Sequence, residues 1–86
     1  MKKQILVVDD ELMMTTLLEF FLGEKYSVKP VSSGKEALLW LENNLPDLII
    51  SDIQMSEMDG FELLEIIRLG GFTKHTPVIM LSGRSE

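Results

Sequence analysis

The chain has 86 residues, of which 45% are hydrophobic, with no cysteine and a formal net charge of −6 at pH 7. This length supports one hydrophobic core, so we expect residues 1–86 to form one domain. The acidic excess argues against direct nucleic-acid binding, because Lys and Arg supply most of that affinity. Thiolate metal sites and disulfides are excluded. No apolar run approaches the roughly 18 residues of a membrane span, which predicts a cytoplasmic protein.

Short apolar runs predict the strands of a buried sheet. Residues 5–8, 48–50 and 78–81 are continuous apolar runs, the pattern of parallel strands that are covered on both faces. Residues 27–31 form a weaker run that contains Pro30. Proline has no N–H to donate to a neighbouring strand, so this second strand is expected at an edge of the sheet.

Longer amphipathic stretches between these runs predict three helices. We expect helices over residues 11–22, 37–41 and 61–69, each with apolar residues at helical spacing. Ser33 and Glu36 match the capping-box pattern before the second helix. The resulting order of elements alternates strands with helices, which is typical of an α/β protein with a parallel sheet.

The helical patterns also predict which side chains face the core. Met13 and Met80 are expected in core packing, the commoner use of methionine. Thr15, Thr16 and Glu19 are expected on the exposed face of the first helix. A polar stripe on the third helix is predicted to face solvent, and it consists of Glu62, Glu65 and Arg68.

The topology follows from the handedness of strand–helix–strand units. Crossovers between parallel strands are almost always right-handed, and the second strand is expected at an edge. These two constraints favour the strand order 2-1-3-4, the beginning of a flavodoxin-like α/β sheet. Functional sites in such sheets lie beyond the carboxyl ends of the strands, where the order reverses. Here that point falls between the first and third strands.

Polar residues follow three of the predicted strands directly. Asp9 and Asp10 come after the first strand, Asp52 after the third, and Ser82 after the fourth. Clustered carboxylates repel one another unless a cation intervenes. Mg²⁺ suits such oxygen ligands, and an Asp carboxylate can act as a nucleophile and form an aspartyl phosphate.

Each of these residues also has a purely structural alternative. Asp9 or Asp10 alone could cap the first helix. Asp52 could be a turn residue, and Ser82 with Gly83 reads most simply as a turn. The functional interpretation depends on the coincidence that all of these residues lie at one edge of the sheet.

Four segments together resemble the receiver domain of two-component response regulators. They are ILVVDDE at residues 5–11, LIISDIQM at 48–55, MDGFE at 58–62 and PVIMLSG at 77–83. The resemblance implies a CheY-like fold and a signalling module rather than an enzyme. It also implies that a sensor histidine kinase or a phosphotransfer protein is the partner, docking on the first helix.

The resemblance assigns a role to each site residue. Asp52 would accept the phosphoryl group and would also be a ligand of Mg²⁺. Asp10 would bind the ion directly, with Asp9 assisting directly or through water. Gln54 would offer its backbone carbonyl to the metal, while its side chain, like that of Arg84, would tune the lifetime of the phosphate. Ser82 would be the switch hydroxyl that moves to the phosphoryl group.

Two departures from the family pattern stand out. Ser56 occupies a position that is usually proline, and we expect a looser loop after Asp52 as a result. The sequence also ends after the fourth strand, so the usual fourth helix, fifth strand and fifth helix are missing, with the lysine and the aromatic switch residue that they carry. An uncovered fourth strand predicts a partial receiver domain that is poorly stable as a monomer, or a swapped or homodimeric assembly, or a piece of a longer protein.

Three functions compete on the sequence alone. The first is a phosphoacceptor switch. The second is a fragment that serves only for interaction or assembly, without phosphorylation. The third is a phosphatase of the haloacid dehalogenase type, which is disfavoured because that class requires a second Asp where this chain has Gln54.

Overall fold

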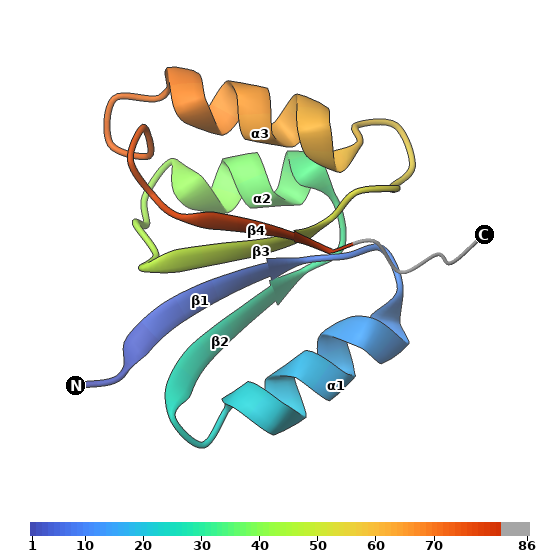
Figure 1. Ribbon diagram of the computed structural model, residues 1–86, viewed down its shortest axis with the longest axis vertical. Helices are drawn as coiled ribbons and strands as arrows, with labels where there is room; N and C mark the ends of the chain where they lie inside the picture. The colour runs from blue at the N-terminus through green and yellow to red at the C-terminus, as the bar shows by residue number, and fades with distance from the viewer. Residues whose placement is uncertain (82–86) are drawn as a thin grey trace.

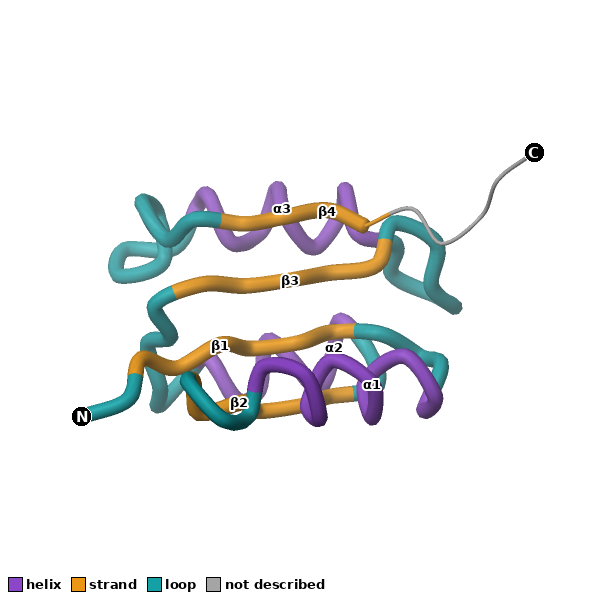
Figure 2. The backbone as a smooth tube through the Cα atoms, turned by 60° about the horizontal axis from the view of Figure 1, so that its bottom comes forward, coloured by secondary structure: helices purple, strands orange, loops and turns teal. Residues whose placement is uncertain are grey.

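Four parallel strands form one sheet, and its order is β2-β1-β3-β4 (Figure 2). The computed structural model describes residues 1–81. The strands are β1 (Lys3–Val8), β2 (Tyr26–Val31), β3 (Leu48–Asp52) and β4 (Val78–Leu81). In the register, Val8 of β1 lies opposite Val31 of β2 on one side and Ser51 of β3 on the other. The predicted strand order and the edge position of β2 are confirmed.

Three helices cover the sheet unequally. They are α1 (Leu12–Leu22), α2 (Gly34–Leu41) and α3 (Gly60–Leu69). Helices α2 and α3 lie side by side on one face, and α1 lies on the opposite face (Figure 1). We call these the two-helix face and the one-helix face. Within residues 1–81, no helix is both long enough and apolar enough to cross a membrane.

The alternation of side chains along the strands divides the core between the two faces. Leu6 and Ile49 point to the two-helix face, where they pack with Leu63 of α3, and all three are fully buried. Ile5 and Ile50 point to the one-helix face and pack with partly buried residues of α1. Successive strand residues point to opposite faces, so both faces receive apolar side chains from the same strands.

Side-chain caps define where α2 and α3 begin. The Ser33 hydroxyl accepts a hydrogen bond from the Glu36 N–H at 3.0 Å, but the Glu36 carboxylate accepts from the N–H of Ser32 rather than that of Ser33. The predicted capping box at α2 is therefore only half formed. A complete box occurs at α3, where Asp59 and Glu62 each accept from the other's N–H at 2.9 Å.

Helix α1 corrects two predictions from the sequence. Thr15 was expected on the exposed face, but only 5% of its surface is accessible. Met13 was expected in the core, but it is 76% exposed. The Thr15 hydroxyl donates to the Leu12 carbonyl at 3.0 Å, which satisfies the buried group and makes its burial inexpensive. The sheet-facing stripe therefore contains Thr15 together with Leu18 and Leu22, which pack against the strands.

Strand β4 is less buried than its apolar sequence predicts. The expectation was burial on both faces, yet Ile79 is 47% exposed and the other three residues are only partly buried. In the part of the chain that the structure describes, α1 lies over β1 and β2, and no helix lies over β4 on the one-helix face (Figure 2). A cavity of about 360 Å³ remains on that face, lined in part by Ile5, Leu48, Ile50 and Ile79.

The connection from α3 to β4 is held by Arg68. Its guanidinium donates from Nη1 to the backbone carbonyls of Thr76 at 2.6 Å, Lys74 at 3.2 Å and Thr73 at 3.4 Å. Arg68 is exposed, as the sequence predicted, and its guanidinium in addition donates to three backbone carbonyls of this connection.

Candidate metal centre

Three carboxylates converge at the carboxyl ends of β1 and β3. Asp9 and Asp10 follow β1 directly, and Asp52 is the last residue of β3. Because β1 and β3 are neighbours with Val8 opposite Ser51, the residues that follow are brought side by side. Asp9, Asp10 and Asp52 each offer an oxygen, and these oxygens lie within 4.8 Å of one another. The clustering predicted from the strand ends is confirmed for all three residues.

Asp9 is the buried member of the cluster. Its side chain is 6% exposed, and its Oδ1 accepts a hydrogen bond from the Glu11 N–H at 2.9 Å. Burial raises the pKa of the Asp9 carboxyl, and the nearby charges of Asp52, Glu11 and Asp10 raise it further, while the hydrogen bond from Glu11 opposes them. Its burial and its acidic neighbours thus destabilise the ionised form of Asp9.

Asp10 is exposed but not free to rotate. Its Oδ2 accepts a hydrogen bond from the Ser56 backbone N–H at 3.1 Å and a longer one from the Ser56 hydroxyl at 3.4 Å. This contact joins the end of β1 to the loop after β3, across 46 positions of sequence. The sequence pattern missed it. The available signal was the replacement of proline, which has no N–H, by a residue that has one.

The start of α3 packs closely against the backbone of Asp52 and Ile53. Gly60 is buried, and its N–H donates to the Ile53 carbonyl at 2.8 Å. A Cβ at Gly60 would collide with the Asp52 carbonyl oxygen and would lie 3.0 Å from the Ile53 Cα. Only glycine lets α3 approach β3 this closely, so Gly60 determines how the end of β3 is placed. The sequence pattern predicted no such role for Gly60.

Of the remaining predicted site residues, the structure describes only Gln54. Gln54 lies two residues after Asp52, in the loop between β3 and α3, with an exposed side chain. Ser82, the predicted switch hydroxyl, lies outside the described residues, as do Gly83 and Arg84. The described part of the site is therefore the acidic cluster with the loop beside it.

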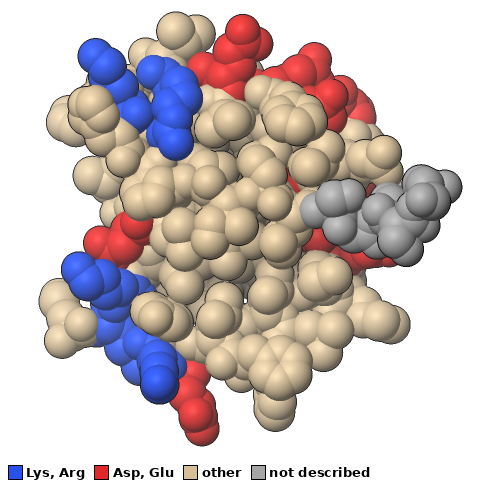
Figure 3. Space-filling model, in the orientation of Figure 1, with Lys and Arg blue, Asp and Glu red and all other residues tan. Residues whose placement is uncertain are grey.

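The two signs of charge are only partly separated on the face shown in Figure 3. Lys and Arg gather in two groups at the left, with acidic side chains between and below them, and further acidic side chains show at the top and at the right. A cluster of hard oxygen donors, one of them destabilised by its neighbours, fits a divalent cation such as Mg²⁺. The residues present therefore suit the ion that the sequence predicted.

Fold and site together define a doubly wound α/β protein with a carboxylate centre at its topological switch point. Comparison with known protein families matches residues 5–86 to the response regulator receiver domain. The chain belongs to this family. The acidic triad Asp9, Asp10 and Asp52 is typical of the Mg²⁺ site of receiver domains.

Individual relatives agree with this assignment. The chain is 39% identical to the regulatory protein PhoP for alkaline phosphatase synthesis of Bacillus subtilis, covering 100% of this chain and 35% of that protein. It is also 39% identical to histidine kinase P4 of Formosa agariphila, covering 99% of this chain and 6% of that protein. The chain thus spans only a small part of these relatives. The structure of the chemotaxis response regulator CheY4 of Vibrio cholerae superposes with a TM-score of 0.93 at 31% identity, covering 100% of this chain and 72% of that one.

Proposed function

We propose that this chain is a phosphoacceptor switch that receives a phosphoryl group on Asp52 and does not turn over an external substrate. The observation that supports this most is the position of three carboxylate oxygens within 4.8 Å at the ends of β1 and β3, in a member of the receiver family. The donor would be a phosphohistidine on a sensor histidine kinase or on a phosphotransfer protein, in the cytoplasm.

The transfer would form one bond and break one. An oxygen of Asp52 attacks the phosphorus in line with the P–N bond of the phosphohistidine, and the imidazole leaves with the bonding electron pair. Asp9 and Asp10, with the backbone carbonyl of Gln54, would hold Mg²⁺ beside Asp52. When bound, the ion offsets negative charge on the phosphoryl oxygens. The protein otherwise contributes position, because the strand ends fix where Asp52 lies.

Phosphorylation would change the local charge and bias a switch. The aspartyl phosphate carries about −2 where the carboxylate carried −1. Ser82 would respond as the hydroxyl that hydrogen-bonds a phosphoryl oxygen. The family resemblance supports this role for Ser82, a residue outside the described part of the chain.

The test is phosphorylation by a small donor. We expect acetyl phosphate with Mg²⁺ to add one phosphoryl group to the chain, read as an increase in intact mass. Asp52→Asn should abolish the adduct. Asp47→Asn is the matched control, because Asp47 precedes β3 and Asp52 ends it, and this variant should be phosphorylated like the parent. An adduct that persists in Asp52→Asn would refute the assignment.

A second candidate function is assembly through the one-helix face and the β4 edge. It is favoured by the exposed Ile79 and by the cavity of about 360 Å³ beside it, which resemble a surface that another chain covers. Sedimentation of the chain at several concentrations tests it. A concentration-dependent dimer that Ile79→Lys abolishes would support assembly, and a monomer at all concentrations would refute it. We do not propose phosphatase chemistry, because Gln54 offers no general acid.

A further inference from the structure

The loop between β3 and α3 contacts the acidic cluster at one point. The Ser56 backbone N–H donates to Asp10 Oδ2 at 3.1 Å, and the Ser56 hydroxyl lies 3.4 Å from the same oxygen. The amide contact is the better hydrogen bond of the two, since a hydroxyl donor normally approaches to about 2.7 Å. The backbone hydrogen bond is therefore the main contact between this loop and Asp10.

Asp10 needs an external restraint to hold one orientation. It is exposed, and it directly follows Asp9 at the point where β1 ends. A surface Asp side chain samples several rotamers, and ordering it for a ligand costs conformational entropy. A hydrogen bond on Oδ2 removes that freedom in advance. A carboxylate has two oxygens and about four acceptor positions, so Asp10 keeps capacity for a cation.

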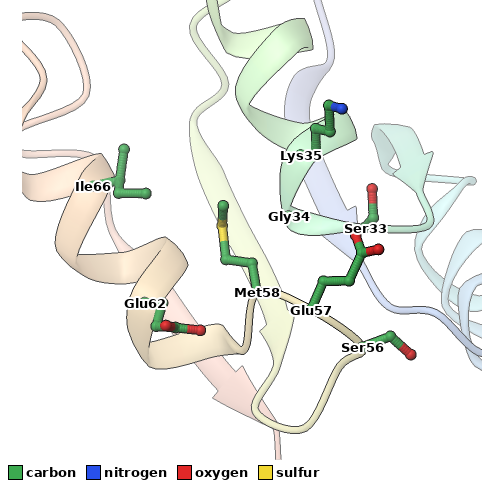
Figure 4. A pocket seen from close by; sticks show the side chains of 8 residues that line it. All are labelled: Ser33, Gly34, Lys35, Ser56, Glu57, Met58, Glu62 and Ile66. Atoms are coloured by element: carbon green, nitrogen blue, oxygen red, sulfur yellow. The ribbon is translucent and has the colours of Figure 1, made fainter.

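The loop that presents the Ser56 N–H is itself held on both sides. Met58 points between α2 and α3, where it packs against the core of the two-helix face (Figure 4). A Cβ at Gly34 would lie 2.7 Å from the Met58 sulfur, so the start of α2 closes tightly on this side chain. Asp59 begins α3 with a complete capping box. These contacts fix the loop just after Ser56.

Glu57 shows that the loop geometry is imposed by its surroundings. Its φ is 68°, in the left-handed region that non-glycine residues rarely adopt. Such a conformation persists only when neighbouring contacts determine it. Ser56 borders the same pocket as Glu57 and Met58, but its side chain is directed away from that of Met58 (Figure 4). The chain therefore turns sharply between a residue facing the cluster and one anchored in the core.

We propose that Ser56 is a positioning residue, whose backbone N–H holds the Asp10 carboxylate ready for a divalent cation. The inference deepens the proposed function and rests on the acidic cluster being the cation site. It also gives the departure from proline a consequence, because proline at this position has no N–H and could not form the bond. Ser56 acts through Asp10 and does not itself bind the metal.

Two substitutions separate the amide from the hydroxyl. Ser56→Ala removes the hydroxyl and keeps the N–H, while Ser56→Pro removes both. The probe is magnesium chloride alone, titrated into the chain in a calorimeter. We expect Ser56→Ala to bind Mg²⁺ like the parent and Ser56→Pro to bind about tenfold more weakly, at the lower end of the effect of losing a partner of a metal ligand. Equal affinity in Ser56→Pro and the parent would overturn the proposal, as would an equal loss in Ser56→Ala.

A second measurement keeps Ser56 intact. In the parent without Mg²⁺, the Ser56 amide proton should resonate downfield and exchange slowly, because it is hydrogen-bonded to a carboxylate. Asp10→Ala should move it upfield and speed its exchange, and Asp47→Ala, at the other end of β3, should not. An unchanged Ser56 amide in Asp10→Ala would overturn the proposal. Both measurements stand without phosphorylation, so a parent chain that takes no phosphoryl group would refute the proposed function alone.

Discussion

The two faces of the sheet receive similar apolar side chains but bury them to different extents. On the two-helix face, Leu6, Ile49 and Leu63 are completely buried. On the one-helix face, Ile50 retains 8% of its accessible surface and Ile79 retains 47%. The strands supply apolar residues to both faces in alternation, so the difference comes from which helices lie above them. Burial in this sheet is decided by coverage and not by the hydrophobicity of the strands.

This difference has a consequence for the candidate metal centre. Asp9 follows β1 and Asp52 ends β3, the two central strands, whose residues face both sides of the sheet. We expect the centre to depend more on the packing of the two-helix face, because the residues of these strands are buried most completely there. Substitutions on each face test this dependence.

The largest effect is expected from Leu63→Ala on the two-helix face. Deleting a fully buried leucine side chain should lower the free energy of unfolding by about 2–5 kcal/mol, through lost burial and the cavity left behind. Urea denaturation measures it. Leu69→Ala in the same helix is the control, because Leu69 is 83% exposed and should change stability by less than about 0.5 kcal/mol. Equal losses would show that α3 does not pack as described.

Gly60→Ala should have the next largest effect. The added methyl group meets the Asp52 carbonyl, so α3 or the end of β3 must move, at a cost of about 1–3 kcal/mol. Because the movement occurs at Asp52, Mg²⁺ binding should weaken as well. Gly71→Ala is the matched control, since a Cβ there meets no atom within 4 Å. A Gly60→Ala variant as stable as Gly71→Ala would contradict the close approach of α3.

Asp9→Asn should change how stability depends on pH. The pKa of Asp9 is raised in the folded chain, so the folded state holds its proton more tightly than the unfolded state does. Stability should therefore fall as the pH rises from the ordinary pKa of Asp through the raised one. The Asn side chain does not ionise, and its amide oxygen can still accept the hydrogen bond from the Glu11 N–H. We expect it to be more stable than the parent at neutral pH and no more stable in acid.

Urea denaturation across a pH series, with a chelator present, gives this comparison. In a separate series without the chelator, added Mg²⁺ should stabilise the parent more than the variant, because only the parent has the complete cluster. A stability difference between the two chains that does not change with pH would contradict the prediction.

Ile79→Thr should have the smallest effect and probes the open face directly. A half-exposed residue loses little burial, so we expect a change within about 0.5 kcal/mol. Ile49→Thr, fully buried on the opposite face, should cost more than 1 kcal/mol by the same measurement, at about the penalty for burying a hydroxyl. If the two substitutions cost the same, a second copy or another segment covers Ile79 in solution.

The sheet could be predicted because its signals are local and strong. Continuous apolar runs marked the strands, and Pro30 placed β2 at the edge. These two facts with the handedness rule were enough to place Asp9, Asp10 and Asp52 together. The order of the strands alone therefore predicts that these three carboxylates lie together.

The wrong predictions concern side chains whose orientation or burial does not follow from the hydrophobic pattern. Helix α1 is apolar on two stripes, so its pattern could not show that Thr15 faces the sheet and Met13 faces solvent. The exposure of Ile79 depends on which helices lie above β4, which is a property of the assembled layers. The bond from Ser56 to Asp10 joins distant segments through a backbone group, and backbone donors carry no sequence signal except at proline.

The Arg68 contacts give the molecule two regions that differ in their response to ionic strength. Its partners are the neutral carbonyls of Thr73, Lys74 and Thr76, so these hydrogen bonds depend little on screening by added salt. The carboxylates of Asp9, Asp10 and Asp52 form a partly exposed cluster. The repulsion among them therefore weakens as the Debye length shortens, to about 3 Å at 1 M. A monovalent salt should therefore relax the strain in the acidic cluster while the connection into β4 keeps its geometry.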